Sequence, residues 1–446
     1  MPGSIWLGGC SKRPSAEMPN IILITVDALR ADHLGCYGYP KNTSPNIDRF
    51  AQDALLFENC FSHSPATRPS FASIVSGFLP HETRIFENML LLPREVKTLP
   101  EILKQLGYKT TAVVSNYVLR KKQGFEQGFL IYDDIMNDLE LVRRCPERIA
   151  QHTTDRAVEL LKESHKSPLF MWIHYQDPHG PYTPPARFST QFRISGQKPR
   201  NLRVNTSLSG CGGIPSYQQL VANRDFYFYL SQYDGEIRYQ DEHFKRLVHA
   251  LKQLDLYNRS LIIFSSDHGE GMGEHNYYFA HGENLYSILT HVPLIIKYGN
   301  QLVGRRTDFV QHIDIVPTIL RILKLKVNPY FRGCDLRQKG TEEREIFAEM
   351  QSPLIPDGVK FSIVLKGLKL IYTPLFEQYE LFDLKTDPQE LNNIATHDNY
   401  RKHADYLKVR LDRIRNEDFL VIRDVKKRPR LTKEEAEKLR SLGYVK

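Results

Sequence analysis

Residues 20–27 read Asn-Ile-Ile-Leu-Ile-Thr-Val-Asp, a continuous apolar run rich in β-branched residues that ends in a carboxylate. A run of this length and composition predicts a strand buried on both faces, as in a parallel sheet covered by helices. Similar runs recur at residues 110–115, 169–174, 261–266 and 293–297. We therefore expect residues 20–26 to be the first of several strands in one sheet.

Segments in which apolar residues recur at helical spacing separate these strands. Leu99, Leu103 and Leu106 give one such pattern, and the sequence predicts helices over residues 99–106, 148–163, 237–254 and 314–323. Strands that alternate with helices are typical of an α/β fold. The sequence thus predicts a large, mostly parallel central sheet flanked by helices.

The pattern changes after about Cys334. Two strand-like runs at residues 361–365 and 368–372 flank a Lys-Gly turn, which predicts a hairpin, and residues 379–384 and 399–416 add a strand and a helix. We expect a small α+β subdomain with an antiparallel sheet. The predicted division is an N-terminal extension (1–18), a large α/β domain (19–334), and a C-terminal subdomain with its tail (335–446).

The composition excludes several classes of protein. Of 446 residues, 41% are hydrophobic and 25% are charged, which excludes disordered, collagen-like and disulfide-scaffold chains. The net charge of +8 favours anionic partners only weakly and fits an ordinary solvated surface. No run of about 18 apolar residues predicts a membrane-spanning helix, and no nucleic-acid-binding motif is present.

The N-terminus carries an ambiguous targeting signal. Residues 7–10 read Leu-Gly-Gly-Cys, similar to a bacterial lipobox, but only nine residues precede Cys10. That is too few for a basic segment followed by an apolar one. The sequence as it stands predicts a cytoplasmic protein, whereas a truncated lipobox at Cys10 would place it in the periplasm or anchor it to a membrane.

Polar residues follow the predicted strands at the points where those strands end. Asp27 follows the first strand, Asp267 and His268 follow the strand at 261–266, and His179 lies shortly after the strand at 169–174. Sites in open α/β sheets form at the carboxyl ends of strands. Each residue alone is usually a cap or a turn residue. Together, a carboxylate at one strand end and an Asp-His pair at another predict a divalent-metal site.

Several ordered segments resemble one known family. Residues 19–27 are similar to its first strand and first metal ligand, and residues 233–269 to its long helix, strand and Asp-His-Gly ligand pair. With further matches at 311–318 and 379–388, the chain resembles the sulfatases of the alkaline phosphatase superfamily over nearly its whole length. The resemblance implies a metal-dependent ester hydrolase with an anionic substrate. It also implies one divalent ion held by Asp27, Thr67, Asp267 and His268.

The departures from the family pattern bear on the substrate. Sulfatases carry Cys or Ser at the first position of a C-x-P-S-R motif and oxidise it to formylglycine, whereas residues 67–71 read Thr-Arg-Pro-Ser-Phe. Threonine cannot form that aldehyde, but it is the nucleophile in relatives that act on phosphate esters. Asn116 and His281 stand where the family has two sulfate-binding lysines, and Ala28 stands where it usually has a second aspartate.

These departures predict a hydrolase of phosphate or phosphonate esters with Thr67 as the nucleophile. The alternatives are a sulfuric ester hydrolase and a phosphotransferase that uses the same phosphothreonine intermediate. The mixed oxygen and nitrogen ligands favour Mn or Zn, with Mg or Ca as alternatives.

The resemblance also suggests roles for the residues around Thr67. His179 or His281 would protonate the leaving group, because histidine titrates near neutral pH. Asn116 would bond a substrate oxygen, and Arg68 either contacts substrate or covers the start of a helix. Pro69 suits a first helical turn, so Thr67 is predicted near a helix N-terminus, where anions bind.

Overall fold

The structure is a computed structural model. It describes residues 18–416, apart from 143, 165–167, 194–195, 221, 341–342 and 352–356, together with Glu434 and Glu437. The lipobox-like segment at Cys10 and most of the C-terminal tail lie outside the described residues. Within the described part of the chain, no helix combines the length and the apolar character needed to cross a membrane.

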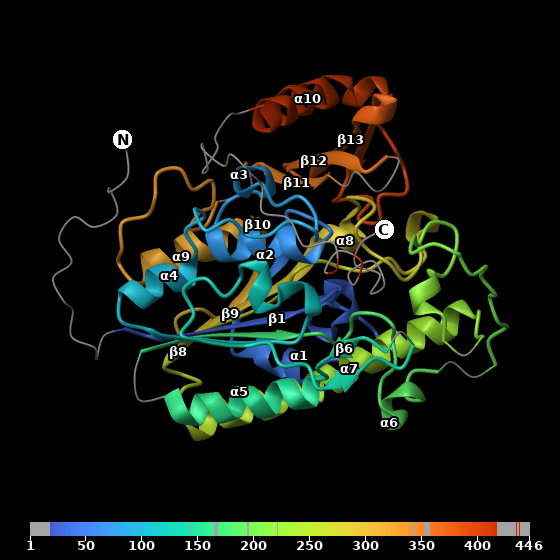
Figure 1. Cartoon of the computed structure of the whole chain (residues 1–446). Helices are drawn as coiled ribbons and strands as arrows, with labels where there is room; N and C mark the ends of the chain where they lie inside the picture. The colour runs from blue at the N-terminus through green and yellow to red at the C-terminus, as the bar shows by residue number, and fades with distance from the viewer. Residues whose placement is uncertain are drawn as a thin grey trace.

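A twisted eight-stranded sheet forms the centre of the molecule (Figure 1). Its strand order is β10-β2-β9-β8-β1-β7-β3-β4. Strand β1 pairs in parallel with both β7 and β8, and β9 runs antiparallel to both of its neighbours. The strands are β1 (Asn20–Val26), β2 (Leu55–Phe61), β3 (Lys109–Val114), β4 (Ile131–Asp133), β7 (Leu169–Tyr175), β8 (Ser260–Ser266), β9 (His291–Tyr298) and β10 (Gly304–Gln311).

Helices cover both faces of this sheet, and β1 shows why its sequence is apolar throughout. Ile21 and Leu23 pack into the core beneath one helical layer, and Ile22 and Ile24 pack into the core beneath the other. The first layer holds α2 (Thr67–Ser76), α4 (Leu99–Gln105) and α9 (Ile315–Ile322). The second layer holds α1 (Pro45–Gln52), α5 (Ala150–Ser164) and α7 (Phe226–Gln253) (Figure 1).

A separate antiparallel sheet lies in the C-terminal region, beyond α2 and α3 (Pro80–Thr83) (Figure 1). Its strands, in order, are β11 (Ile346–Gln351), β12 (Val359–Leu365), β13 (Leu368–Thr373) and β14 (Gln378–Asp383). Helix α10 (Arg401–Asn416) packs on one face through Leu407 and Leu411. The other face contacts the large domain, where Met350 and Phe382 pack against Leu285.

Short elements complete the described chain: β5 (Asp138–Leu139), β6 (Pro146–Glu147), α6 (Ala186–Ser189) and α8 (Ser287–Thr290). The predicted fold class, a mostly parallel sheet flanked by helices plus a small antiparallel sheet, is confirmed. Helix α7 begins at Phe226, eleven residues before the predicted start at Ile237. The first turns of α7 are dominated by aromatic residues, which weakens the helical pattern in the sequence.

Candidate active site

The two carboxylates of the predicted metal site lie side by side because their strands are in register. Val26 of β1 pairs with Ser266 of β8, so Asp27 and Asp267 each follow the last paired residue of adjacent parallel strands. One ligand atom from each of Asp27, Asp267 and His268 lies within 4.8 Å of the others. The carboxyl edge of the sheet therefore brings the three predicted ligands together.

The donor set fits a divalent cation. Asp27 Oδ1 and Asp267 Oδ2 are buried and accept no hydrogen bond from any residue that the structure describes. Buried carboxylate oxygens without a donor are strongly unfavourable unless a positive charge compensates them. A cation bound between them would supply that charge, and the carboxylates and imidazole are typical ligands of Mn²⁺ and Zn²⁺.

His268 turns its second ring nitrogen toward this cluster. Its Nδ1 lies 2.9 Å from the carbonyl oxygen of Gly269, and since a carbonyl only accepts, Nδ1 carries the hydrogen. The lone pair of the neutral ring is therefore on Nε2. Nε2 lies 3.5 Å from Asp267 Oδ2 and 3.8 Å from Asp27 Oδ1.

Thr67 lies next to His268 at the start of a helix. It is the first residue of α2, it is fully buried, and its Oγ1 is 3.3 Å from His268 Nε2. The preceding turn is held by the Ser64 carbonyl, which accepts hydrogen bonds from the Ser62 and Ser70 hydroxyls. The partial positive charge of the helix N-terminus favours an anion in front of Thr67.

The second oxygen of Asp27 faces an amide and an imidazole. Asn116 Nδ2 donates a hydrogen bond to Asp27 Oδ2, while Asn116 Oδ1 accepts one from the Val118 amide at 2.7 Å. His174 Nε2 lies 3.7 Å from the same carboxylate oxygen. Asn116 and His174 therefore orient Asp27, and Asn116 is bonded to a carboxylate rather than directed only at a substrate position.

The imidazoles around Asp27 set its charge. Burial raises the pKa of Asp27, but the nearby His179, His174 and His268 lower it by more than burial raises it. The net pKa of Asp27 therefore lies below the usual range. The pKa of Asp267 is raised by burial and by the adjacent Asp27 carboxylate. Without a cation between the two carboxyl groups, Asp27 therefore ionises more readily than Asp267.

Three imidazole rings lie next to one another beside the carboxylates, with His281 between the other two. The ring of His281 lies 4.3 Å from that of His268 and 5.1 Å from that of His179, measured between centroids. The Glu270 carboxylate, which is fully buried, accepts from His281 Nδ1 at 3.3 Å. Burial lowers the pKa of His281, but Glu270 and the Asp27 carboxylate raise it more, so the net pKa is raised.

Arg68 lies beside Thr67 but its side chain is turned toward the main chain. Its Nε donates to the Val118 carbonyl at 2.6 Å and its Nη1 to the Leu90 carbonyl at 3.2 Å. Of the predicted site residues, Asp27, Thr67, Asn116, Asp267, His268, His179 and His281 lie around one point. The described contacts of Arg68 hold the loops that surround α2.

Sequence reasoning gave Glu270 no role, although it lies in the Asp-His-Gly-Glu motif. The signal that could have identified Glu270 is its position two residues after His268. In the structure its carboxylate contacts His281, eleven residues further along the chain. His174 lies near the end of β7 and was not among the predicted site residues. Its partner Thr25 lies on β1, where it also accepts a hydrogen bond from Trp172 Nε1 at 2.9 Å.

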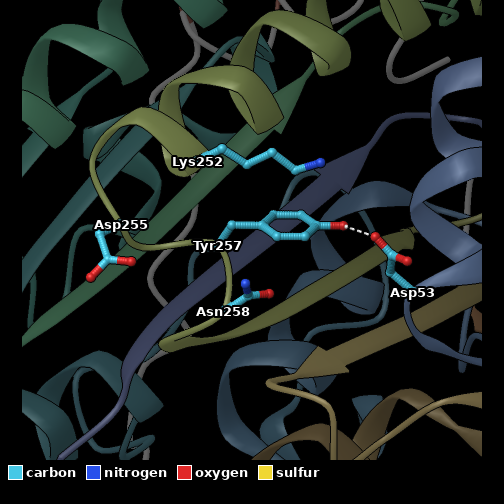
Figure 2. Close-up of a pocket in the computed structure, with 5 residues that line it drawn as sticks. All are labelled: Asp53, Lys252, Asp255, Tyr257 and Asn258. Atoms are coloured by element: carbon cyan, nitrogen blue, oxygen red, sulfur yellow. Dashed lines mark hydrogen bonds between the residues drawn. The ribbon is translucent and has the colours of Figure 1, made fainter.

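A surface cavity of about 280 Å³ lies at the opposite end of the sheet, before β2 and β8 (Figure 2). Its lining residues are Asp53, Lys252, Asp255, Tyr257 and Asn258. The Tyr257 hydroxyl donates to Asp53 at 3.1 Å, and Asp255 pairs with Arg259 at 3.2 Å. The cavity therefore lies away from the carboxyl edge, where the predicted metal ligands meet.

Comparisons with known proteins find relatives over most of the chain. Residues 19–325 match the family model described as sulfatase, and residues 273–417 match the model of the C-terminal region of N-sulphoglucosamine sulphohydrolase. N-acetylglucosamine-6-O-sulfatase of Bacteroides thetaiotaomicron is 23% identical over 89% of this chain and 86% of its own. Human iduronate 2-sulfatase is 27% identical over 70% of each chain.

Solved structures share the fold. A protein solved in complex with its substrate, D-glucosamine-2-N,6-O-disulfate, superposes with a TM-score of 0.76 at 20% identity, over 90% of this chain and 99% of that one. The phosphonate monoester hydrolase of Agrobacterium radiobacter superposes with a TM-score of 0.73 at 20% identity, over 89% and 95%. The same architecture thus occurs in proteins named for sulfated and for phosphonate substrates.

Proposed function

The chain belongs to the sulfatase family and is an ester hydrolase, and within that family we propose that it cleaves phosphate or phosphonate esters with Thr67 as the nucleophile. One observation carries the proposal. Thr67 occupies the first position of the sulfatase motif, where Cys or Ser would form the aldehyde, and its Oγ1 lies 3.3 Å from His268 Nε2. Because threonine is not converted to the aldehyde, residue 67 keeps a hydroxyl group, which can attack phosphorus as a nucleophile.

The residues that would hold the divalent ion are Asp27, Asp267, His268 and Thr67, with Mn or Zn favoured by the mixed donor set. When bound, the ion would supply positive charge that lowers the pKa of the Thr67 hydroxyl and offsets the charge of the phosphoryl oxygens. Asn116 and His174 would keep Asp27 in the orientation that this site requires.

The chain's own groups account for the bond changes. Thr67 loses its hydroxyl proton to water, and its Oγ1 forms a bond to phosphorus as the bond to the leaving oxygen breaks. We assign to His281 the proton that this oxygen takes up, because its ring lies 4.3 Å from that of His268 and Glu270, which accepts from its Nδ1, raises its pKa. Water then attacks the phosphothreonine and gives a proton back to His281, and the bond from phosphorus to Oγ1 breaks. Oγ1 takes back from water the proton that Thr67 lost in the first step.

A direct assay can test whether the enzyme prefers phosphorus esters to sulfate esters. We would assay bis(p-nitrophenyl) phosphate, p-nitrophenyl phenylphosphonate, p-nitrophenyl phosphate and p-nitrophenyl sulfate in the presence of Mn²⁺ or Zn²⁺. We expect kcat/KM for at least one phosphorus ester to exceed that for the sulfate ester by tenfold or more. The Thr67→Ala variant controls for contaminating activity. Turnover of the sulfate ester alone, unchanged in Thr67→Ala, would contradict both the substrate class and the nucleophile.

A further inference from the structure

One strand of the small C-terminal sheet contacts the chain segments on both sides of the nucleophile helix. Strand β11 hydrogen-bonds to His63, which lies four residues before Thr67, and to His81, which lies five residues after the end of α2. The segment between these two histidines contains all of α2. The small sheet therefore touches the helix at both of its connections.

His63 forms the connection on the side of Thr67. It is fully buried, its Nδ1 donates to the Phe347 carbonyl at 2.6 Å, and its own carbonyl accepts from the Glu349 amide at 2.9 Å. Its Nε2 accepts from the Ile313 amide at 3.4 Å. The partners are main-chain groups of β11 and of the turn before α9, so the ring is fixed between two parts of the fold.

His81 forms the connection on the other side. Both its main-chain N–H and its ring Nδ1 donate to Glu349 Oε1 at 2.7 Å. Glu349 itself is buried on β11, and its second oxygen accepts from Gln351 Nε2 at 2.9 Å. Glu349 thus reaches the segment before α2 through its main chain and the segment after α2 through its side chain.

We propose that β11 acts as a clamp on α2, and that His63 and His81 are positioning residues that fix where Thr67 presents its hydroxyl. The proposal rests on the function proposed for Thr67. Displacement of a reacting group by about 1 Å can reduce a rate by roughly a hundredfold. A helix held at both connections resists such displacement, whereas α2 itself is only ten residues long.

Asn and Gln substitutions separate hydrogen bonding from packing at His63. The Asn Nδ2 is attached to Cγ, as is the histidine Nδ1, so His63→Asn can still donate to the Phe347 carbonyl. In Gln the amide nitrogen is one bond further out, although the side chain fills the space better. We expect His63→Asn to keep most of kcat and His63→Gln and His63→Ala to lose tenfold or more, with KM little changed. His81→Asn and His81→Gln should follow the same order with smaller losses, because the main-chain bond to Glu349 remains.

Leu407→Ala is the matched control. Leu407 is buried between α10 and the small sheet, in a cluster that includes no residue of α2, so its truncation should lower the melting temperature without changing kcat of the folded enzyme. A fall in kcat for Leu407→Ala equal to that for His63→Ala would mean that general loss of stability, not the clamp, controls the rate. Retention of kcat in His63→Gln above that in His63→Asn would also overturn the proposal.

Hydrogen exchange gives a readout that does not depend on activity. Peptides that cover α2 should exchange faster in His63→Gln than in the wild type or in His63→Asn, and should be unchanged in Leu407→Ala. If the wild type hydrolyses no ester at all, the proposed function fails, yet faster exchange of α2 in His63→Gln still supports the clamp. Unchanged exchange of α2 in both His63→Gln and His63→Ala would exclude it.

Discussion

Acidification should destabilise the wild-type protein more than its His63→Asn variant. Burial lowers the pKa of His63 to about 4, an effect that the Phe347 carbonyl only partly offsets. In the unfolded chain the pKa of a histidine is about 6.5. Between these two values the unfolded state binds a proton that the folded state excludes, so the free energy of unfolding falls as the pH falls.

The size of the effect follows from the difference between the two pKa values. A difference of about 2.5 corresponds to about 3 kcal/mol, at roughly 1.4 kcal/mol for each pH unit. The stability that His63 contributes is fully present above about pH 6.5 and is lost progressively as the pH approaches 4. Asparagine does not titrate, so the His63→Asn variant lacks this component of the pH dependence.

Urea unfolding of both proteins at several pH values from about 7.5 to about 4.5 measures the difference. Both proteins should be treated with a chelator, so that loss of metal at low pH does not add to the slope. Burial first, and the neighbouring His63 second, lower the pKa of His312 to about 3, so the larger part of its contribution is common to both proteins. The difference in unfolding free energy should shift by about 2 kcal/mol between the two ends of this range. Parallel stability curves would refute a neutral, buried His63.

Three further outcomes are expected. Thr67→Ala should lower kcat by several orders of magnitude while Thr67→Ser keeps part of the activity, and mass spectrometry of enzyme quenched during turnover should find a phosphoryl group on Thr67; full activity in Thr67→Ala would exclude this nucleophile. A chelator should abolish activity, Mn²⁺ or Zn²⁺ should restore it, and elemental analysis of Asp267→Asn should show much less bound metal than the wild type. Glu390→Gln should reduce the free energy of unfolding by about 3–5 kcal/mol, because it removes the carboxylate that lies 2.7 Å from the buried Lys369. Adding Lys369→Met to that variant should recover most of the loss, as measured by chemical denaturation.

The sequence predicted best those elements whose residue pattern is typical of only one kind of secondary structure. Strand β1 begins and ends at the predicted residues, since a seven-residue apolar run suits only a doubly covered strand. Strand β10 was not predicted, because Gly304–Gln311 lies at the edge of the sheet and carries Arg, Thr and Asp in its exposed and half-buried part. Strand β9 was predicted as part of a parallel sheet, and the residue pattern of a buried strand does not reveal that it runs antiparallel.

In the candidate site, side-chain chemistry was easier to predict than the partner of each side chain. Asp27, Asp267 and His268 were predicted to converge, and the register of β1 with β8 provides the physical reason. Asn116 was expected to bond a substrate oxygen, which stays a prediction; the bond that its amide donates to Asp27 was not predicted. This bond depends on the direction of the chain after β3, for which the sequence offers no pattern.

His63 illustrates where residue patterns stop being informative. Its partners are the carbonyl of Phe347 and the amides of Ile313 and Glu349, and main-chain groups are the same in every residue. A metal site leaves a record in residue types because only a few side chains bind metal. The bonds that hold His63 come from main-chain groups of β11 and leave no such record, and the sequence analysis also failed to predict β11 as a strand. Substitutions in β11 that keep both its backbone bonds and the Glu349 side chain should therefore be tolerated. Glu349→Pro, which removes the amide that binds His63 and the carboxylate that binds His81, should disturb α2 from a distant part of the chain.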